Sequence, residues 1–463
     1  MTTGPVPLTG AVAEFVVQSD TSTLPEGALG LAERALVDTV GVALAATSDP
    51  TVAAIWAALG HRLPSGPSSV LTQPRRTQPD EAALLNGTAA HALDYDDVVD
   101  DLIGHPSAVL IPTALASSEE SGASGRELLD AYCVGYQVEN ALAAGLSIDR
   151  HYARGWHSTA TLGVVAATAT AARLLGLDTT QVRHALGIAG SLAGGSRRNF
   201  GTMTKPLHAG LAASHGIQAC LLALSGFTAD PEHLEAPLGY FALYGEEVSL
   251  EASVETLQGP WLLGRRGLNV KRFPCCYYAH RAAGAALDLA HEDLDADDVE
   301  DVVVTVQPGG LAPLIHHAPM TGLQGKFSLE YIVAACLIDR ELNLRSFTDS
   351  SVRRDSAQRL LSVVRVEESD VPAVGPPEVE GGYAAVRVRT RHGDCLERRL
   401  DIAPGHALSP LSEQELADKF RDCLSFSSRE YDIEELYRRL RSVRDEPTVS
   451  ELFDGAAPRA ETA

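Results

Sequence analysis

The sequence has few aromatic residues, few lysines and only three methionines. Aromatic side chains make up 5% of the 463 residues, whereas apolar residues as a class reach 45%. An interior with so few rings must consist mainly of alanine, leucine and valine, and these side chains suit closely packed helices. The chain is also too long for one ordinary hydrophobic core, so we expect two domains.

Cysteine, positive charge and long apolar runs are scarce as well. The seven cysteines show no metal-ligand spacing, and an odd number suits a reducing compartment better than a disulfide framework. The formal net charge of -24 argues against nucleic acid and an acidic membrane surface as partners. We expect no bilayer span, because the apolar runs are shorter than a span requires. Residues 1–10 have neither the charged region nor the apolar region of a signal peptide. We therefore expect a cytoplasmic protein with no membrane partner.

Only four of the 37 basic residues are lysines, namely Lys205, Lys271, Lys326 and Lys419. The chain otherwise uses arginine, which suggests that some of these positions need an ammonium group. An ammonium can lower its pKa and transfer a proton, whereas a guanidinium cannot. We interpret Lys205 and Lys271 in this way because of their surroundings. Lys419 lies in an amphipathic run over 412–424, and we interpret it as incidental.

Hydrophobic periodicity changes once along the chain, shortly after residue 271. Before that point, helical spacing predicts helices over 31–46, 81–95, 107–120, 125–146, 158–174, 179–194, 206–224 and 230–245. After it, alternation predicts strands over 299–307, 363–368, 383–393 and 396–403, with helices over 278–291, 326–340 and 349–361. The helical pattern returns over 412–443. We predict a mainly α protein with an α+β part, in which a helical domain spans 1–268 and 405–463 and an α+β domain spans 269–404.

The densest group of chemically active side chains lies in 91-HALDYDDVVDDLIGHPSAVLIP-112. Carboxylates at positions 94, 96, 97, 100 and 101 stand between His91 and His105. Three interpretations are open: a solvated helix end, a magnesium site like the aspartate-rich motif of isoprenoid synthases, or an Asp that orients His105 or binds a substrate hydroxyl. The magnesium site needs a second ligand motif, and the sequence has none of the required Asn-to-Ser spacing.

Three further segments carry candidate cations. His157 begins an alanine-rich helix, where free N–H groups and the helix dipole favour an anion. Lys205 lies between Thr204 and Pro206 at the start of another helix. A cation there opposes the dipole, so we interpret Lys205 as functional, with a substrate carboxylate bridging it and the backbone amides. The third segment is 271-KRFPCCYYAHRAAG-284, near the expected domain junction.

Taken in order, these segments resemble the MmgE/PrpD family. The matching stretches include 34-RALVDTVGVALAA-46, 91-HALDYDD-97, 155-GWHSTATLG-163, 199-NFGTMTKPLHAGLAASHG-216 and 270-VKRFPCCYYAHRA-282. The family includes 2-methylcitrate dehydratase, cis-aconitate decarboxylase and iminodisuccinate epimerase. The resemblance implies a helical domain built from both chain ends, a smaller inserted α/β lid, a homodimer, and catalysis without a metal or an organic cofactor.

The resemblance also implies where the site residues lie. It places Asp94 and His105 on one wall, His157 and Lys205 on another, and Lys271 opposite with the helix that follows it. The catalytic set that we predict is His105, His157, Lys205 and Lys271, and the substrate-binding set is Asp94, Thr204, Tyr277, His280 and Arg281.

We expect a reaction that forms or consumes a carbanion-like centre next to a carboxylate. Lys205 and Lys271 would hold substrate carboxylates while a histidine moves the proton. We predict a lyase that acts on a small anionic polycarboxylate, with a 2-methylcitrate-dehydratase-like reaction first. Decarboxylation of cis-aconitate type and epimerisation of a substituted dicarboxylate are the alternatives on the same site. A magnesium-dependent isoprenoid synthase and a helical interaction scaffold are the alternatives from other classes.

Cis-aconitate decarboxylation ranks below dehydration because the sequence departs from the family's decarboxylase at two places. Val98 and Val99 stand where that decarboxylase has a Thr, and Cys276 stands where it has a His.

Overall fold

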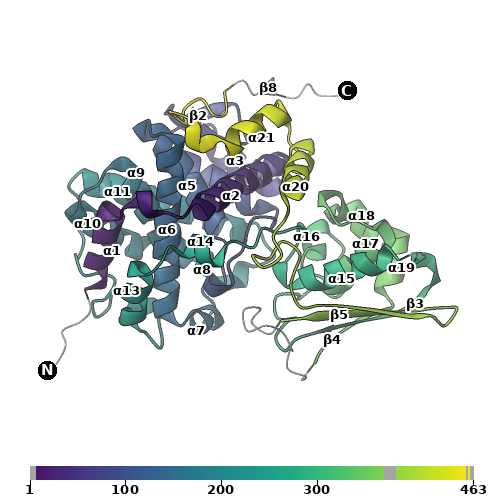
Figure 1. Ribbon diagram of the computed structural model, residues 1–463. Helices are drawn as coiled ribbons and strands as arrows, with labels where there is room; N and C mark the ends of the chain where they lie inside the picture. Colours follow the sequence, from purple (N-terminus) through teal and green to yellow (C-terminus); the bar gives the residue numbers. More distant parts are fainter. Residues whose placement is uncertain (1–6, 293, 370–381, 455–456, 459–463) are drawn as a thin grey trace. The chain divides into compact units, whose positions relative to one another are not determined.

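The computed structural model describes residues 7–292, 294–369, 382–454 and 457–458. The chain divides into two compact units, of which unit 1 comprises Met1–Asn269 and Glu413–Ala463 and unit 2 comprises Val270–Ser412. Unit 1 is formed almost entirely by helices, whereas unit 2 contains a four-stranded sheet (Figure 1). The predicted fold class, mainly α with an α+β part, is confirmed.

Unit 1 is a bundle of helices drawn from both ends of the chain. Its helices are α1 (Leu8–Gln18), α2 (Glu26–Ala45), α3 (Pro50–Leu59), α4 (Pro79–Ala92), α5 (Pro106–Ser121), α6 (Gly125–Leu146), α7 (Ile148–Ala153), α8 (Ser158–Thr161), α9 (Gly163–Leu175), α10 (Thr179–Leu192), α11 (Thr204–Leu224), α12 (Tyr240–Tyr244), α13 (Leu250–Gln258), α14 (Leu262–Arg266), α20 (Glu413–Ser425) and α21 (Ile433–Arg441). A short hairpin, β1 (Ser68–Val70) with β2 (Arg75–Thr77), and a two-residue antiparallel pair, β7 (Arg429–Glu430) with β8 (Ala457–Pro458), complete the unit.

Local sequence signals explain where these helices begin. At α6, Ser124 and Glu127 form a reciprocal capping box, and at α10 Asp178 and Gln181 do the same. The predicted helix over 230–245 is wrong over 230–239. Only Tyr240–Tyr244, at the end of that range, is helical. Proline and glycine interrupt that stretch, so its apolar spacing does not lead to a continuous helix.

Two helical segments of unit 1, Ser158–Leu175 and Thr204–Leu224, are long and apolar enough to cross a membrane. A pair of helices over 26–59, with a bend between them, is also long and apolar enough if the pair is taken as one span. Our expectation that no such run exists is therefore wrong. In the structure, 83% of the first window and 61% of the second are buried inside the protein. Helices α9 and α11 pack on each other and on α5, and a helix enclosed in this way is apolar on most of its faces.

Helices α4 and α11 cross at two glycines, and this crossing positions the site described below. A Cβ atom on Gly87 would lie 2.9 Å from the Cα of Gly210, and a Cβ on Gly210 would lie 2.3 Å from the carbonyl oxygen of Leu84. The two helices can approach this closely only because neither position carries a side chain. His91 follows Gly87 by about one helical turn, and Lys205 precedes Gly210 on α11.

We expect Gly210→Ala to lower the free energy of unfolding by about 1–3 kcal/mol, because the new methyl group meets backbone that cannot move aside. Urea unfolding followed by circular dichroism measures the change. Gly30→Ala in α2 is the matched control, since a Cβ there has no atom within 4 Å and the position is helical. It should raise stability by about 0.5–1 kcal/mol. Equal stability of the two variants would show that the crossing tolerates a side chain.

Unit 2 has one mixed sheet with helices packed on it. Its elements are α15 (His280–Ala290), β3 (Val299–Val306), α16 (Gly322–Gly325), α17 (Leu329–Asp339), α18 (Asp349–Arg353), α19 (Asp355–Leu361), β4 (Val364–Glu368), β5 (Ala384–Thr390) and β6 (Cys395–Leu400). The strand order is β4-β3-β5-β6, with β3 and β4 parallel and the other pairs antiparallel. Helix α15 packs against β5 and β6, and α17 packs against α15 and β4. Alternate residues of β5 are buried, which is the pattern that its sequence predicts.

Candidate active site

The loop between α4 and α5 carries two of the predicted site residues, Asp94 and His105, and its backbone is strained at two points. Asp94 and Ile103 have positive φ angles, 53° and 44°. The left-handed region is unfavourable for side chains with a Cβ and most unfavourable for a β-branched residue such as isoleucine. Such strain persists only where the surrounding contacts enforce it, and it is common at functional sites.

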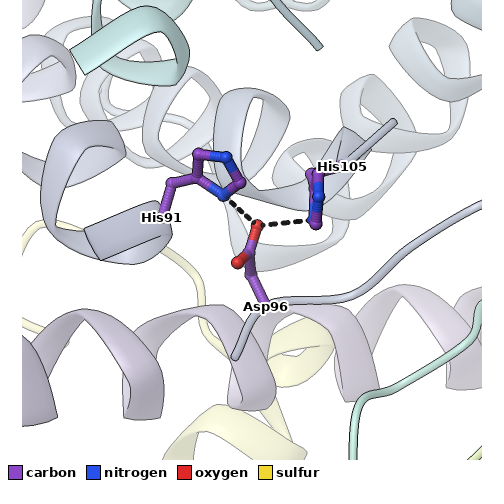
Figure 2. Close-up of side chains that lie close together, drawn as sticks. All are labelled: His91, Asp96 and His105. Atoms are coloured by element: carbon purple, nitrogen blue, oxygen red, sulfur yellow. Dashed lines mark hydrogen bonds and ion pairs between the residues drawn. The ribbon is translucent and has the colours of Figure 1, made fainter. Parts of the chain in front are cut away.

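Inside this loop, one carboxylate lies between two imidazoles (Figure 2). Oδ2 of Asp96 lies 2.8 Å from Nδ1 of His91 and 3.1 Å from Nδ1 of His105. The side chains of His91 and Asp96 are fully buried, whereas that of His105 is 13% exposed. Among the sequence-based interpretations, the contact agrees with an Asp that orients His105.

The other carboxylates of the segment have separate partners. Asp97 is buried and accepts hydrogen bonds from the backbone N–H and the hydroxyl of Ser107, while burial raises its pKa to about 7. Asp100 accepts from the side-chain amide of Asn269 at 2.9 Å, and Asp101 forms an ion pair with an arginine. The segment over 96–99 lies in a bend and two bridges, and Asp100 begins a 3-10 helix of one turn, so no α-helix carries these aspartates. It therefore does not present its aspartates as the helical motif of isoprenoid synthases does.

Lys205 and Asp94 form a buried ion pair. Nζ of Lys205 lies 2.5 Å from Oδ1 of Asp94, and the two residues are 6% and 5% exposed. Helix α11 begins at Thr204, with no side-chain cap at the preceding residue, Met203. A cation at this helix start is therefore stabilised by a carboxylate that is distant in sequence.

His157 lies close to the same ion pair in unit 1. Its Nδ1 is 3.1 Å from Nδ1 of His208, and its ring centroid is 5.8 Å from that of His91. The ring of Phe200 lies 4.9 Å from the ring of His157 and 5.2 Å from Nζ of Lys205. This aromatic ring covers both an imidazole and the ammonium, which limits their contact with water.

Side-chain hydroxyls join the helix that follows His157 to the loop. The hydroxyl of Ser158 donates to the carbonyl oxygen of Ile103 at 2.5 Å, and Thr159 Oγ1 accepts from the backbone N–H of His105 at 3.1 Å. These contacts fix the backbone of His105. They do not engage the backbone N–H groups at the helix start, so anion binding there stays a prediction.

The buried imidazoles are neutral near pH 7 in this arrangement. Burial is the main cause of a lowered pKa at each imidazole. It lowers the pKa of His91 to about 4, holds the pKa of His157 well below the usual value, and lowers the pKa of His208. The positive charge of Lys205 lowers all three further. Burial raises the pKa of Asp96, but the attraction of two imidazoles outweighs this and holds it well below the usual range. The cluster is thus a buried polar environment in which the ammonium of Lys205 is the positive group and the imidazoles are neutral.

The same cluster has the composition of a metal site. Ligand atoms of His91, Asp96 and His105 all lie within 4.8 Å of one another. Two histidines and a carboxylate can bind zinc or ferrous iron. The hydrogen bonds described above engage Nδ1 of both imidazoles and Oδ2 of Asp96, whereas Nε2 of His91 and Oδ1 of Asp96 are buried without a hydrogen-bond partner among the described residues. The geometry therefore allows either use.

Of the remaining predicted residues, Thr204 begins α11 in unit 1, and Lys271, Tyr277, His280 and Arg281 lie in unit 2. Lys271 is 1% exposed, and His280 is fully buried at the start of α15, where its ring lies 5.1 Å from the ring of Tyr277. Arg281 donates from Nε to the carbonyl oxygen of Asp401 at 2.9 Å. Within unit 2, Arg281 therefore has a role in holding the chain together, and its assignment to substrate binding stays a prediction.

Sequence reasoning missed several residues of the cluster. His91 and Asp96 were noted within a dense segment but were not assigned to the site, and neither was His208, which contacts His157. Lys419 was interpreted as incidental, yet it is buried and lies 2.5 Å from Asp38. The close spacing of His91, Asp96 and His105 in the sequence was the available signal.

Comparison with known proteins identifies the family. Residues 10–253 match the MmgE/PrpD N-terminal domain, and residues 273–441 match the MmgE/PrpD C-terminal domain. The chain belongs to the MmgE/PrpD family. Among curated MmgE/PrpD relatives, human cis-aconitate decarboxylase is 30% identical over 84% of this chain and 83% of its own length.

Two further relatives carry the same name. Mouse cis-aconitate decarboxylase is 28% identical over 86% of this chain and 83% of its own length. Cis-aconitate decarboxylase of Aspergillus terreus is 23% identical over 96% of both chains. These relatives are lyases, which supports the prediction that this MmgE/PrpD protein is an enzyme, whereas none of the three carries the dehydratase name that we placed first.

Proposed function

We propose that this protein is a lyase that removes carbon dioxide from a small unsaturated polycarboxylate of the cis-aconitate type. The observation that carries the proposal is the buried ammonium of Lys205, which is paired with Asp94 and lowers the pKa of the neighbouring imidazoles of His91, His157 and His208. The names of the family relatives support the choice of decarboxylation.

The proposed chemistry follows from charge. When the bond to a carboxylate breaks, carbon dioxide leaves and the electron pair stays on the substrate, where it spreads through the double bond onto a neighbouring carboxylate. The ammonium of Lys205 stabilises this enediolate electrostatically. A histidine imidazolium, His105 or His157, then gives its proton to the carbon, so that a C–H bond forms and the imidazole returns to its neutral state.

Substrate binding supplies the protonated histidine. The imidazoles of His157 and His208 are neutral without ligand because burial and the charge of Lys205 lower their pKa. A bound polycarboxylate brings several negative charges and therefore raises the pKa of the same histidines. A histidine of the site is thus protonated only when a substrate that can accept the proton is bound.

Dehydration of a citrate-like hydroxy acid is the second candidate. The specific observation in its favour is that two imidazoles, His105 and His157, share the site, since dehydration needs both a base for the carbon-bound proton and an acid for the leaving hydroxyl. The same ammonium would stabilise the same kind of enediolate.

Proton NMR of the purified protein with cis-aconitate, citrate and 2-methylcitrate in deuterium oxide tests the proposal. We expect cis-aconitate to lose carbon dioxide and to take up deuterium from the solvent. His157→Asn should lower the rate roughly 100-fold or more, as is usual when a general acid or base is removed. His61→Asn is the matched control because His61 is exposed on the turn after α3 and should retain the wild-type rate.

Each outcome has a distinct meaning. Water loss from a citrate-like acid would favour the dehydratase candidate. Inertness toward all three acids, together with turnover of a prenyl diphosphate after magnesium is added, would overturn the lyase proposal.

A further inference from the structure

We infer that Asp96 and His91 are positioning residues that fix the tautomer of His105, so that Nε2 of His105 is the atom that exchanges the proton with the substrate. The inference rests on the proposed function, since it concerns the same reaction, but its structural part can be tested without turnover.

The tautomer of His105 follows from the two acceptors at its Nδ1. This nitrogen lies 2.9 Å from the carbonyl oxygen of Asp97 and 3.1 Å from Oδ2 of Asp96. A carbonyl oxygen and an ionised carboxylate can only accept hydrogen bonds. Nδ1 of His105 therefore carries the hydrogen, and in the neutral ring Nε2 carries the lone pair that takes up a proton.

His91 holds the carboxylate from its other side. Nδ1 of His91 lies 2.8 Å from the same Oδ2 of Asp96, and its location in the last turn of α4 fixes the ring within the bundle (Figure 2). Two donors converging on one oxygen leave the carboxylate of Asp96 little freedom to rotate. His91 thus fixes the carboxylate of Asp96, and this carboxylate fixes the ring of His105. The Asp of a catalytic triad orients its histidine in the same way.

Solvent exposure shows which of the three side chains, His91, Asp96 or His105, a substrate can contact. The side chains of His91 and Asp96 have no exposed surface, whereas that of His105 is 13% exposed. The backbone of His105 is fixed as well, by the hydrogen bond from its N–H to Thr159. A small ligand can therefore reach His105 but not the two groups behind it.

Asp96→Asn tests the inference, because asparagine keeps the shape of the side chain but can present an N–H donor to Nδ1 of His105. Because the carbonyl oxygen of Asp97 remains as an acceptor at 2.9 Å, we expect nitrogen NMR of histidine-labelled protein to show that His105 changes from the Nδ1–H tautomer alone to a mixture that contains the Nε2–H tautomer. The signals of His105 are assigned by their loss in His105→Gln. We also expect kcat for the polycarboxylate reaction to fall at least 100-fold while KM changes less than threefold.

Two further variants separate positioning from general stability. His91→Asn keeps an N–H donor near the place of Nδ1, whereas His91→Leu removes it. We expect His91→Asn to retain at least tenfold more activity than His91→Leu. Asp80→Asn, at the start of the same helix, is the control for a lost carboxylate charge, since Asp80 bonds only to Gln218 among the described residues.

The outcomes are decisive in both directions. An unchanged Nδ1–H tautomer of His105 in folded Asp96→Asn would overturn the inference, whatever the activity. If Asp96→Asn does not fold, equal activity of His91→Asn and His91→Leu would overturn it. Loss of activity with a chelator and recovery with one zinc or ferrous ion per chain would also overturn it, because the three groups would then be metal ligands. An intact tautomer switch in a protein that is inert toward polycarboxylates would overturn the proposed function alone.

Discussion

Lys205→Met is expected to lower kcat/KM for the polycarboxylate substrate by at least about 1,000-fold. The substitution removes the buried charge that stabilises the enediolate and attracts the substrate, and the loss of one such group typically costs 100-fold to 1,000-fold in kcat alone. Methionine keeps the length of the side chain, so the cavity changes little. Steady-state kinetics by carbon dioxide release, with circular dichroism as a check of folding, measures the effect.

The partner of Lys205 provides the control. Lys205→Met leaves Asp94 buried at 5% exposure without its cation, which destabilises the protein. Asp94→Asn combined with Lys205→Met removes both charges and should recover most of that stability but none of the activity. Activity within tenfold of the wild type in Lys205→Met would show that the ammonium does not act on the substrate.

Lys419→Met is expected to lower the free energy of unfolding by about 3–5 kcal/mol, the usual cost of breaking a buried ion pair from one side. Nζ of Lys419 lies 2.5 Å from Oδ1 of Asp38, and the two residues are 6% and 3% exposed. Even with its partner present, burial raises the pKa of Asp38. Lys419 also donates to the carbonyl oxygen of Tyr95 at 2.9 Å, so the pair joins α2 and α20 to the loop that carries the site.

Urea unfolding measures this change, and two variants control it. Asp38→Leu with Lys419→Met removes both charges and should restore most of the lost stability. Arg421→Met on the same helix breaks ion pairs with Asp418 and Glu434 at the surface and should leave the urea midpoint almost unchanged. A midpoint for Lys419→Met equal to that of Arg421→Met would mean that the buried pair contributes nothing to stability.

The two lysines illustrate what residue type alone leaves open. Both Lys205 and Lys419 are buried and each lies 2.5 Å from an aspartate. The scarcity of lysine marked both positions, but the amphipathic pattern around Lys419 made it look like a surface residue. Burial and neighbours are set by tertiary packing, so local hydrophobic spacing could not distinguish a lysine on a solvated face from one inside the bundle.

The sequence by itself determined the fold class and the family. Helical spacing before residue 271 and strand alternation after it depend on neighbours in the chain, so they could be predicted locally, as could the order of segments that resemble the MmgE/PrpD family. The helix predicted over 230–245 was wrong over 230–239 because proline and glycine prevent a continuous helix there despite the apolar spacing.

Only the tertiary structure decided which charged groups meet. Asp94 and Lys205 are 111 positions apart, and His157 and His208 are 51 positions apart, so no local pattern relates them. The crossing of α4 and α11 at two glycines brings the first pair together, and burial in the bundle gives their neighbours shifted pKa values. Sequence supplied the ionisable groups, whereas packing decided their partners and their charge, because both depend on contacts between residues far apart in the chain.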